Sequence, residues 1–295
     1  FSQALTDISF ISSKSAGLAG ATVSNSHSVE GAFYNPSGLA HLSTDFELIV
    51  GTTQLYGLDF LEHSYLSFAF SKGFAFTYQH LGTSIKGMSE DYGDYTSYGF
   101  ANNKGYLSRE KSITFSHGIS LLNDRNSKIS IGYNLNYFFV SQGRSAGPTG
   151  DGQNGLPEGE FSSYAIDLGL YASLRNKINF GAFVKNLNSS ELSKGSSSVF
   201  LPRRLDLGIS YHPFKNLVTT FAVERVLGYD ESSFRFGVEY QFNNSFLFRS
   251  GIQINPNRLG VGCAYRFKMF EMSYSLLTHP VLAETNVFDF KVYFE

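Results

Sequence analysis

From residue 45 onward, apolar and polar side chains alternate with a period of two over many short stretches of the sequence. In residues 129–137, Ile, Tyr and Leu take the odd positions, while Ser, Gly and Asn take the even ones. Residues 234–242 repeat the pattern, with Phe, Val and Tyr alternating with Arg, Gly, Glu and Gln. Successive side chains of a β-strand point to opposite faces of the sheet. The alternation therefore predicts antiparallel strands with one apolar and one polar face.

The composition indicates what the apolar face contacts. Aromatic residues make up 16% of the chain, with 29 Phe and 18 Tyr, whereas charged residues make up only 16%. A soluble domain usually has about 25% charged residues. A helical membrane span needs about 20 consecutive apolar residues, and the sequence contains no such run. We therefore expect an all-β, antiparallel transmembrane β-barrel whose apolar face contacts the lipid of a bacterial outer membrane. A soluble β-sandwich or a small soluble barrel is the less favoured interpretation.

The pattern divides into fourteen strands, and single-chain bacterial barrels have an even number. Connections after the even-numbered strands are short, and the longest connections, near residues 83–108, 142–159 and 188–200, follow odd-numbered strands. Such barrels have short periplasmic turns and longer outer loops. This parity places the C-terminus and the N-terminal segment on the periplasmic side. The strands are expected near residues 45–57, 62–71, 73–82, 109–122, 127–141, 160–175, 177–187, 201–214, 217–227, 232–242, 245–254, 258–267, 270–278 and 286–295.

The first 44 residues do not alternate in this way. Residues 12–20 are small and compatible with a helix, and residues 29–42 contain the break Asn35-Pro36-Ser37-Gly38. Proline cannot continue a helix, and it biases the preceding residue towards an extended conformation. A barrel of fourteen strands is too wide for its own side chains to fill. We therefore expect residues 1–44 to form a hatch inside a barrel made of residues 45–295.

Several polar-face positions carry charges of both signs. One interpretation is structural, because buried charges must be paired and mixed charges on neighbouring strands brace a wall. The other is a polar path or an anion-selecting surface. The mixture of signs favours bracing, since a selective pore usually shows one sign. The predicted charge lattice consists of Arg204, Asp206, Glu224, Arg235, Glu239, Arg249 and Arg266.

The sequence gives little evidence for a disulfide, a metal or cofactor site, an enzymatic activity or a nucleic-acid partner. The single Cys263 cannot form an intramolecular disulfide, and the seven His are scattered, so we expect no metal site and no cofactor. Ser116 and His117 are adjacent on a predicted strand and point to opposite faces, so they cannot form a hydrolase pair. We expect no enzymatic activity. A net charge of −2 argues against a nucleic-acid partner. The start at Phe1 is expected to be a mature N-terminus left after cleavage of a leader.

A series of short motifs resembles a known family of barrels. In order they are residues 15–21 (SAGLAGA), 32–40 (AFYNPSGLA), 181–187 (GAFVKNL), 201–208 (LPRRLDLG), 236–240 (FGVEY), 249–251 (RSG) and 259–262 (LGVG), followed by His279. Together they resemble FadL-type barrels and, within that group, the PorV/PorQ family. The chain departs from the pattern at Ser37, where the family often has Ala, and in its short outer loops.

The resemblance implies a fourteen-stranded barrel with an N-terminal hatch, whose motif is Asn35 to Gly38. PorV-type proteins serve the type IX secretion system, so the first hypothesis is an accessory barrel that handles cargo and binds a large translocon barrel or other secretion subunits. The alternative is a FadL-like transporter of long-chain fatty acids or other hydrophobic small molecules. A general porin is a third hypothesis, which the hatch disfavours. The first predicts a closed lumen, and the second predicts an apolar pocket beside the hatch and a gap in the wall.

Overall fold

The computed structural model describes residues 11–84, 106–143, 159–189, 201–228 and 230–294. In these ranges fourteen strands follow three short helical turns in the N-terminal segment, and one more helical turn, η2 (Leu55–Gly57), follows the first strand. The N-terminal turns are α2 (Ser13–Gly17), α3 (Gly31–Tyr34) and η1 (Pro36–His41). The strands are β1 (Phe46–Gln54), β2 (Leu61–Phe70), β3 (Phe74–Ser84), β4 (Tyr106–Asn123), β5 (Ser127–Gln142), β6 (Gly159–Leu174), β7 (Ile178–Lys185), β8 (Arg204–Phe214), β9 (Leu217–Val226), β10 (Ser232–Gln241), β11 (Phe246–Ile254), β12 (Arg258–Phe267), β13 (Phe270–Leu277) and β14 (Thr285–Phe294).

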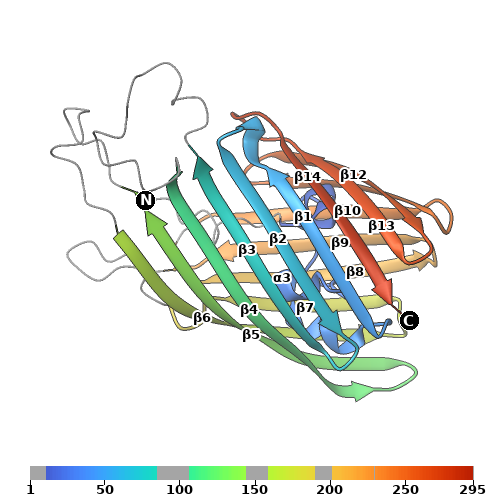
Figure 1. Cartoon of the computed structure of the whole chain (residues 1–295). Helices are drawn as coiled ribbons and strands as arrows, with labels where there is room; N and C mark the ends of the chain where they lie inside the picture. The colour runs from blue at the N-terminus through green and yellow to red at the C-terminus, as the bar shows by residue number, and fades with distance from the viewer. Residues whose placement is uncertain (1–10, 85–105, 144–158, 190–200, 229, 295) are drawn as a thin grey trace, which may run out of the picture.

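Each strand pairs with its neighbours in the sequence, and β1 pairs with β14 to close the barrel. The closing register runs from Phe46 opposite Phe294 to Gln54 opposite Asn286, and all the pairs are antiparallel. The strands are tilted in the wall, as Figure 1 shows. The predicted fourteen-stranded antiparallel barrel is therefore confirmed. The predicted first strand is too long, because the chain turns at Leu55 and Tyr56 takes a left-handed conformation (φ 56°).

The apolar face of the wall points outward. On β6, the outward-facing Leu168 and Leu170 are 45% and 46% exposed. Asp167, the residue before Leu168, faces inward and is 1% exposed. The same alternation of buried and exposed positions continues on β11 and β13. In the described part of the chain, no helix has the length and apolarity required to cross a membrane. The outer surface is thus a continuous apolar wall, and the polar side chains gather in the lumen.

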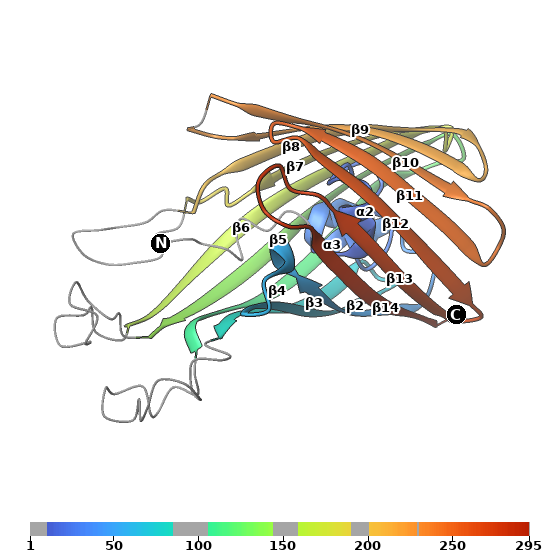
Figure 2. The ribbon, with the colours of Figure 1, turned by 90° about the horizontal axis from the view of Figure 1, so that it is seen from above.

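Short turns join the even-numbered strands to the next strand at the end where the C-terminus lies (Figure 1). Several of their residues have positive φ, such as Gly73, Asn176 and Lys268, as tight hairpins require. The three long connections fall mostly outside the described residues. The N-terminal segment runs inside the barrel, as Figure 2 shows for α2 and α3.

One expectation about the N-terminal segment needs correction. The segment joins β1 at the short-turn end, as expected. However, the Ile11 carbonyl accepts a hydrogen bond from Thr53 Oγ1 (3.4 Å), near the opposite end of β1. Residues 11–44, the lumenal segment, therefore pass through the barrel from the long-connection side to the short-turn side. The alternation of short and long connections predicts the side on which the segment joins β1. It does not predict the path of a segment that folds within the lumen.

Candidate functional site

The lumenal segment consists of short helical turns separated by sharp changes of direction. Ser12 caps α2 by accepting a hydrogen bond from the Ser15 amide (3.4 Å), and Asn35 lies between α3 and η1 with an extended backbone (φ −171°, ψ 100°). Pro36 begins η1, where its missing N–H leaves no unpaired donor. The break predicted at Asn35 and Pro36 is therefore where the segment changes direction.

The predicted hatch motif fastens this bend to the wall. Asn35 Nδ2 donates to the carbonyls of Val23 (2.9 Å) and Leu170 (3.0 Å), so one side chain joins two parts of the segment to each other and to β6. Its Oδ1 accepts from Ser37 Oγ (2.5 Å), and the Ser37 carbonyl accepts from Ser130 Oγ on β5 (2.8 Å). Asn35 and Ser37 are fully buried. The hydroxyl of Ser37, which departs from the resembled family, thus helps to orient Asn35.

Most of the wall contacts the lumenal segment through inward-facing glycines. A Cβ added at Gly118 would lie 2.6 Å from the Ala40 nitrogen, and at most of the other positions the added atom would lie closer still to the segment. At five of these positions the added atom would meet backbone atoms of the segment, and at the other three it would meet the side chains of Asn35, Val23 and Leu18. A side chain at these positions would therefore displace the segment. We call this set the glycine belt. It comprises Gly118, Gly132, Gly169, Gly181, Gly208, Gly237, Gly251 and Gly260, on β4 to β8 and β10 to β12.

The register aligns several glycines of the belt directly opposite one another. Gly132 lies opposite both Gly118 and Gly169 on its neighbouring strands, and Gly251 lies opposite both Gly237 and Gly260. On the side of β1 to β3 the contact is different. There the segment packs side chains such as Phe33 and Leu39 against Ile49, Tyr65 and other apolar residues. The segment is therefore held by an apolar core on one side and by close backbone contact on the other.

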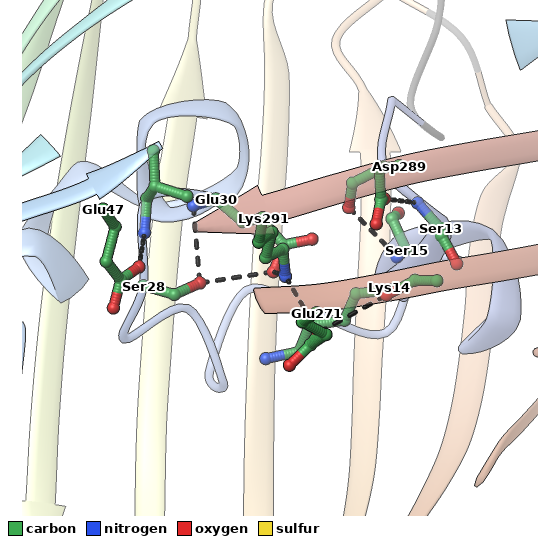
Figure 3. Close-up of polar contacts among 12 residues, drawn as sticks. Ser13, Lys14, Ser15, Ser28, Glu30, Glu47, Glu271, Asp289 and Lys291 are labelled. Atoms are coloured by element: carbon green, nitrogen blue, oxygen red, sulfur yellow. Dashed lines mark hydrogen bonds and ion pairs between the residues drawn. The ribbon is translucent and has the colours of Figure 1, made fainter. Parts of the chain in front are cut away.

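A buried ion pair joins the segment to β14 (Figure 3). Lys291 Nζ lies 2.6 Å from Glu30 Oε2, and both side chains are almost completely buried. Burial alone raises the pKa of Glu30, but Lys291, Lys14 and Arg249 outweigh it and lower that pKa to about 2. Glu30 is therefore a carboxylate at neutral pH.

Further polar contacts surround this pair (Figure 3). The Ser13 amide donates to Asp289 Oδ2 (2.7 Å), and Ser13 Oγ lies 2.8 Å from Ser275 Oγ. The Val29 amide donates to Glu47 Oε2 on β1 (2.8 Å). The start and the middle of the segment are thus bonded to side chains of the wall.

The predicted charge lattice forms two groups. Around β8 to β10, Arg204 lies 3.1 Å from Glu224, and Arg235 contacts both Glu224 and Asp206. In the second group Arg249 lies 2.8 Å from Glu239, and Arg266 lies 2.6 Å from Glu271. All seven predicted residues are therefore in ion pairs, and this pairing supports the bracing interpretation.

Sequence reasoning missed four charged residues that matter most for the lumenal segment. They are Glu30, Glu271, Asp289 and Lys291, and Glu271 connects the Lys291 pair to Arg249 (3.8 Å) and Arg266. Asp289 and Lys291 occupy polar-face positions of the last strand, so the alternation could have found them. Glu30 has no such signal, because it does not lie on a strand.

Two small adjoining cavities lie beside the segment on its long-connection side, and both are lined by Ile11, Phe33 and Lys185. Their remaining walls are largely polar and include Asn134 and Asp167. They also include the first charge group, which we call the Arg204 group: Arg204, Asp206, Glu224 and Arg235. Phe138, an inward-facing aromatic, lines the first cavity. Phe183, another inward-facing aromatic, packs instead against Val23 and Ala222.

Two histidines, His27 and His41, lie on the opposite, short-turn side of the segment. The His27 ring lies 4.5 Å from the Tyr171 ring and 6.2 Å from the His41 ring. Both His27 nitrogens and His41 Nε2 are buried without a hydrogen-bond partner. Burial, followed by Lys14, His41, His212 and Lys128, lowers the pKa of His27 to about 3. Within the described ranges no cluster of His, Cys, Asp and Glu is arranged to hold a metal ion.

Comparison with solved structures places this architecture among known barrels. The Ralstonia pickettii toluene transporter TbuX is 13% identical, over 98% of this chain and 100% of its own, with a TM-score of 0.61. The Pseudomonas putida toluene transporter TodX is 13% identical over 98% and 100%, with a TM-score of 0.60. A Pseudomonas aeruginosa FadL homologue is 10% identical over 96% and 98%, with a TM-score of 0.55.

The chain has the fold of the FadL-type outer-membrane barrels. No family model and no curated protein matches its sequence. At these identities the likeness concerns the fold, and the neighbours are described as transporters and channels rather than enzymes. The finer resemblance to the PorV/PorQ family stays a prediction.

Replacing Gly132 by Ala tests the glycine belt. The new methyl group would collide with the backbone of Pro36 and Ser37, so the segment must shift, at a cost of roughly 1–3 kcal/mol. Hydrogen exchange of the amides in η1 should accelerate. Gly159→Ala is the control, because its added Cβ would meet only the far end of the Phe161 ring. Equal protection of η1 in both variants would contradict the belt.

Replacing Lys291 by Met tests the buried ion pair. Glu30 and Glu271 would then lose a buried counter-charge, and removal of one partner of a buried pair costs about 3–5 kcal/mol. Urea unfolding in lipid vesicles should show this loss. Arg266→Met is the comparison variant, because it also removes a partner of Glu271, but the Arg266 side chain is 48% exposed, so we expect a smaller loss. Equal losses in the two variants would show that the Glu30 pair has no special role.

The histidines predict a pH dependence of the segment's attachment. Because the pKa of His27 falls from 6.5 to about 3, the folded state binds fewer protons, so stability is full above pH 6.5 and declines below it. At pH 5 the loss is about 2 kcal/mol. Glu30 adds to this only below pH 4.5. We expect hydrogen exchange to show that residues 23–42 open more readily at pH 5 than at pH 7.5. This difference should be smaller in His27→Gln. His117→Gln, on the outer wall against Phe74, should leave the profile unchanged.

Proposed function

We propose that this chain is a bacterial outer-membrane transporter in which the lumenal segment acts as a hatch for small molecules. The apolar outer wall supports the location, since only a closed barrel satisfies every backbone group of a strand in lipid. The fold likeness to toluene transporters and monoaromatic hydrocarbon channels supports the class of function.

The observation that carries the proposal is the unequal attachment of the segment. Its covalent link and apolar core are at β1 to β3, whereas the glycine belt and the Glu30–Lys291 pair hold it elsewhere. Contacts of the second kind include only two small apolar clusters, around Leu277 and Phe183, so breaking them exposes less apolar surface than opening the core at β1 to β3 would. The segment can therefore swing away from the belt while it stays anchored beside β1.

A second candidate is an accessory barrel of the type IX secretion system. The specific observations in its favour are the continuous pairing of all fourteen strands and the polar lining of the cavities beside the segment. These match the closed lumen expected of that function better than the apolar pocket and wall gap expected of a fatty-acid transporter. Its partner would be a large translocon barrel.

A reversible covalent lock distinguishes the two candidates. Ser13 and Ser275, whose hydroxyls lie 2.8 Å apart, would be replaced by Cys in a Cys263→Ala background. The protein would be reconstituted in vesicles, and solute passage measured with toluene, the solute named for the neighbours, and with a neutral sugar. We expect passage in the reduced form and none in the oxidised form. Each single-Cys variant is a control.

Two results would contradict the hatch. Equal passage in the oxidised and reduced forms would show that solutes do not pass the segment. Passage of neither solute in any form, including Lys291→Met, would favour the accessory barrel, and recovery of a large barrel with the protein from native membranes would then support it.

A further inference from the structure

The two cavities on the long-connection side of the segment adjoin each other, because both are lined by Ile11, Phe33 and Lys185, and together we call them the chamber. Their volumes are about 30 and 20 Å³. One water molecule in the liquid takes about 30 Å³, so each cavity has room for only a water molecule or so. A solute larger than water can therefore enter the chamber only after the segment has moved.

The charged groups of the chamber already have partners. Lys185, Arg204 and Arg235 supply three positive charges, and Asp167, Asp206 and Glu224 supply three negative ones, so the formal sum is zero. The members of the Arg204 group pair with one another. A balanced and internally paired set of charges attracts neither anions nor cations strongly.

Asp167 is saturated by neutral donors. Its carboxylate accepts from Asn134 Nδ2 (3.1 Å), Asn136 Nδ2 (2.7 Å) and the Asn186 amide (2.8 Å). Asn136 Oδ1 in turn accepts from Thr114 Oγ1 (2.7 Å). This network holds the amide side chains in place and leaves Asp167 with little capacity for a ligand.

Three uncharged polar atoms of the same wall have no partner. They are Ser112 Oγ, Asn134 Oδ1 and Gln79 Oε1, on side chains 1%, 2% and 9% exposed. Buried polar atoms are nearly always hydrogen-bonded, so these three have capacity for a ligand. The hydroxyl can donate or accept, and the amide oxygens accept. Phe33 and Phe138 add apolar surface to the same cavity.

We propose that this chamber recognises small uncharged solutes rich in hydroxyl groups, of the monosaccharide or polyol class, as they pass the hatch. The proposal rests on the hatch function above. Hydroxyl groups satisfy Ser112 and Asn134, whereas a hydrocarbon would leave both unpaired and would face a largely polar wall. The C–H faces of a sugar ring suit the aromatic surface of Phe33 and Phe138.

The test compares arabinose and toluene in vesicles that contain the full chain. Ser112→Ala removes an unpaired hydroxyl and breaks no hydrogen bond of the described structure. Ser116→Ala is the matched control, because Ser116 Oγ is equally buried and unpaired on the same strand but does not line the chamber. We expect Ser112→Ala to slow arabinose roughly twofold to tenfold, the value of one hydrogen bond, with toluene and the control unchanged.

Each other outcome counts against the proposal. Passage of toluene with exclusion of arabinose would overturn it and leave the hatch intact. Equal effects of Ser112→Ala and Ser116→Ala on arabinose would also overturn it, since the chamber would then play no special part. Passage of neither solute, even in Lys291→Met, would remove the hatch function and this inference together.

Discussion

The structure depends on fitting a folded segment of backbone inside a barrel that its own side chains cannot fill. Helical turns of the segment lie directly against the strands, and such contact needs inward positions without side chains. Eight glycines provide these positions on neighbouring strands, in registers that bring several of them directly opposite one another. A single methyl group at most of these sites would push the segment out of place. Close packing, more than any specific bond, therefore decides where the segment sits.

Charge arrangement in the lumen follows from the same enclosure. A charge that the segment and the wall cover must be paired, because leaving water is costly for an ion. Glu30 faces Lys291, and the chain of contacts continues through Glu271 to Arg249 and Glu239. The ion pairs that brace the wall thus also hold the segment. A hatch built in this way would be sensitive to acid, since protons remove carboxylates and charge the buried histidines.

The polar lining of this lumen differs from what the apolar solutes named for the neighbours in fold would lead one to expect. The neighbours in fold are described as toluene transporters and monoaromatic hydrocarbon channels. In this chain the cavities beside the segment are lined by amides, hydroxyls and paired charges. A barrel wall can keep its strand number and register while its inward positions change freely, because these positions face the lumen rather than the lipid. The fold is therefore shared with these neighbours, whereas the lining of the lumen is this chain's own.

The sequence by itself determined the barrel, the strand number and the lipid-facing residues, because a period of two is a local property that each strand shows on its own. It also located the bend at Asn35 and Pro36, since proline acts on its immediate neighbours. Only the tertiary structure decided that Glu30 meets Lys291, that eight separated glycines form one belt, and that Ser112 and Asn134 share a cavity. These relations join residues up to 261 positions apart, and they depend on how the segment folds inside the closed wall, which no local pattern encodes.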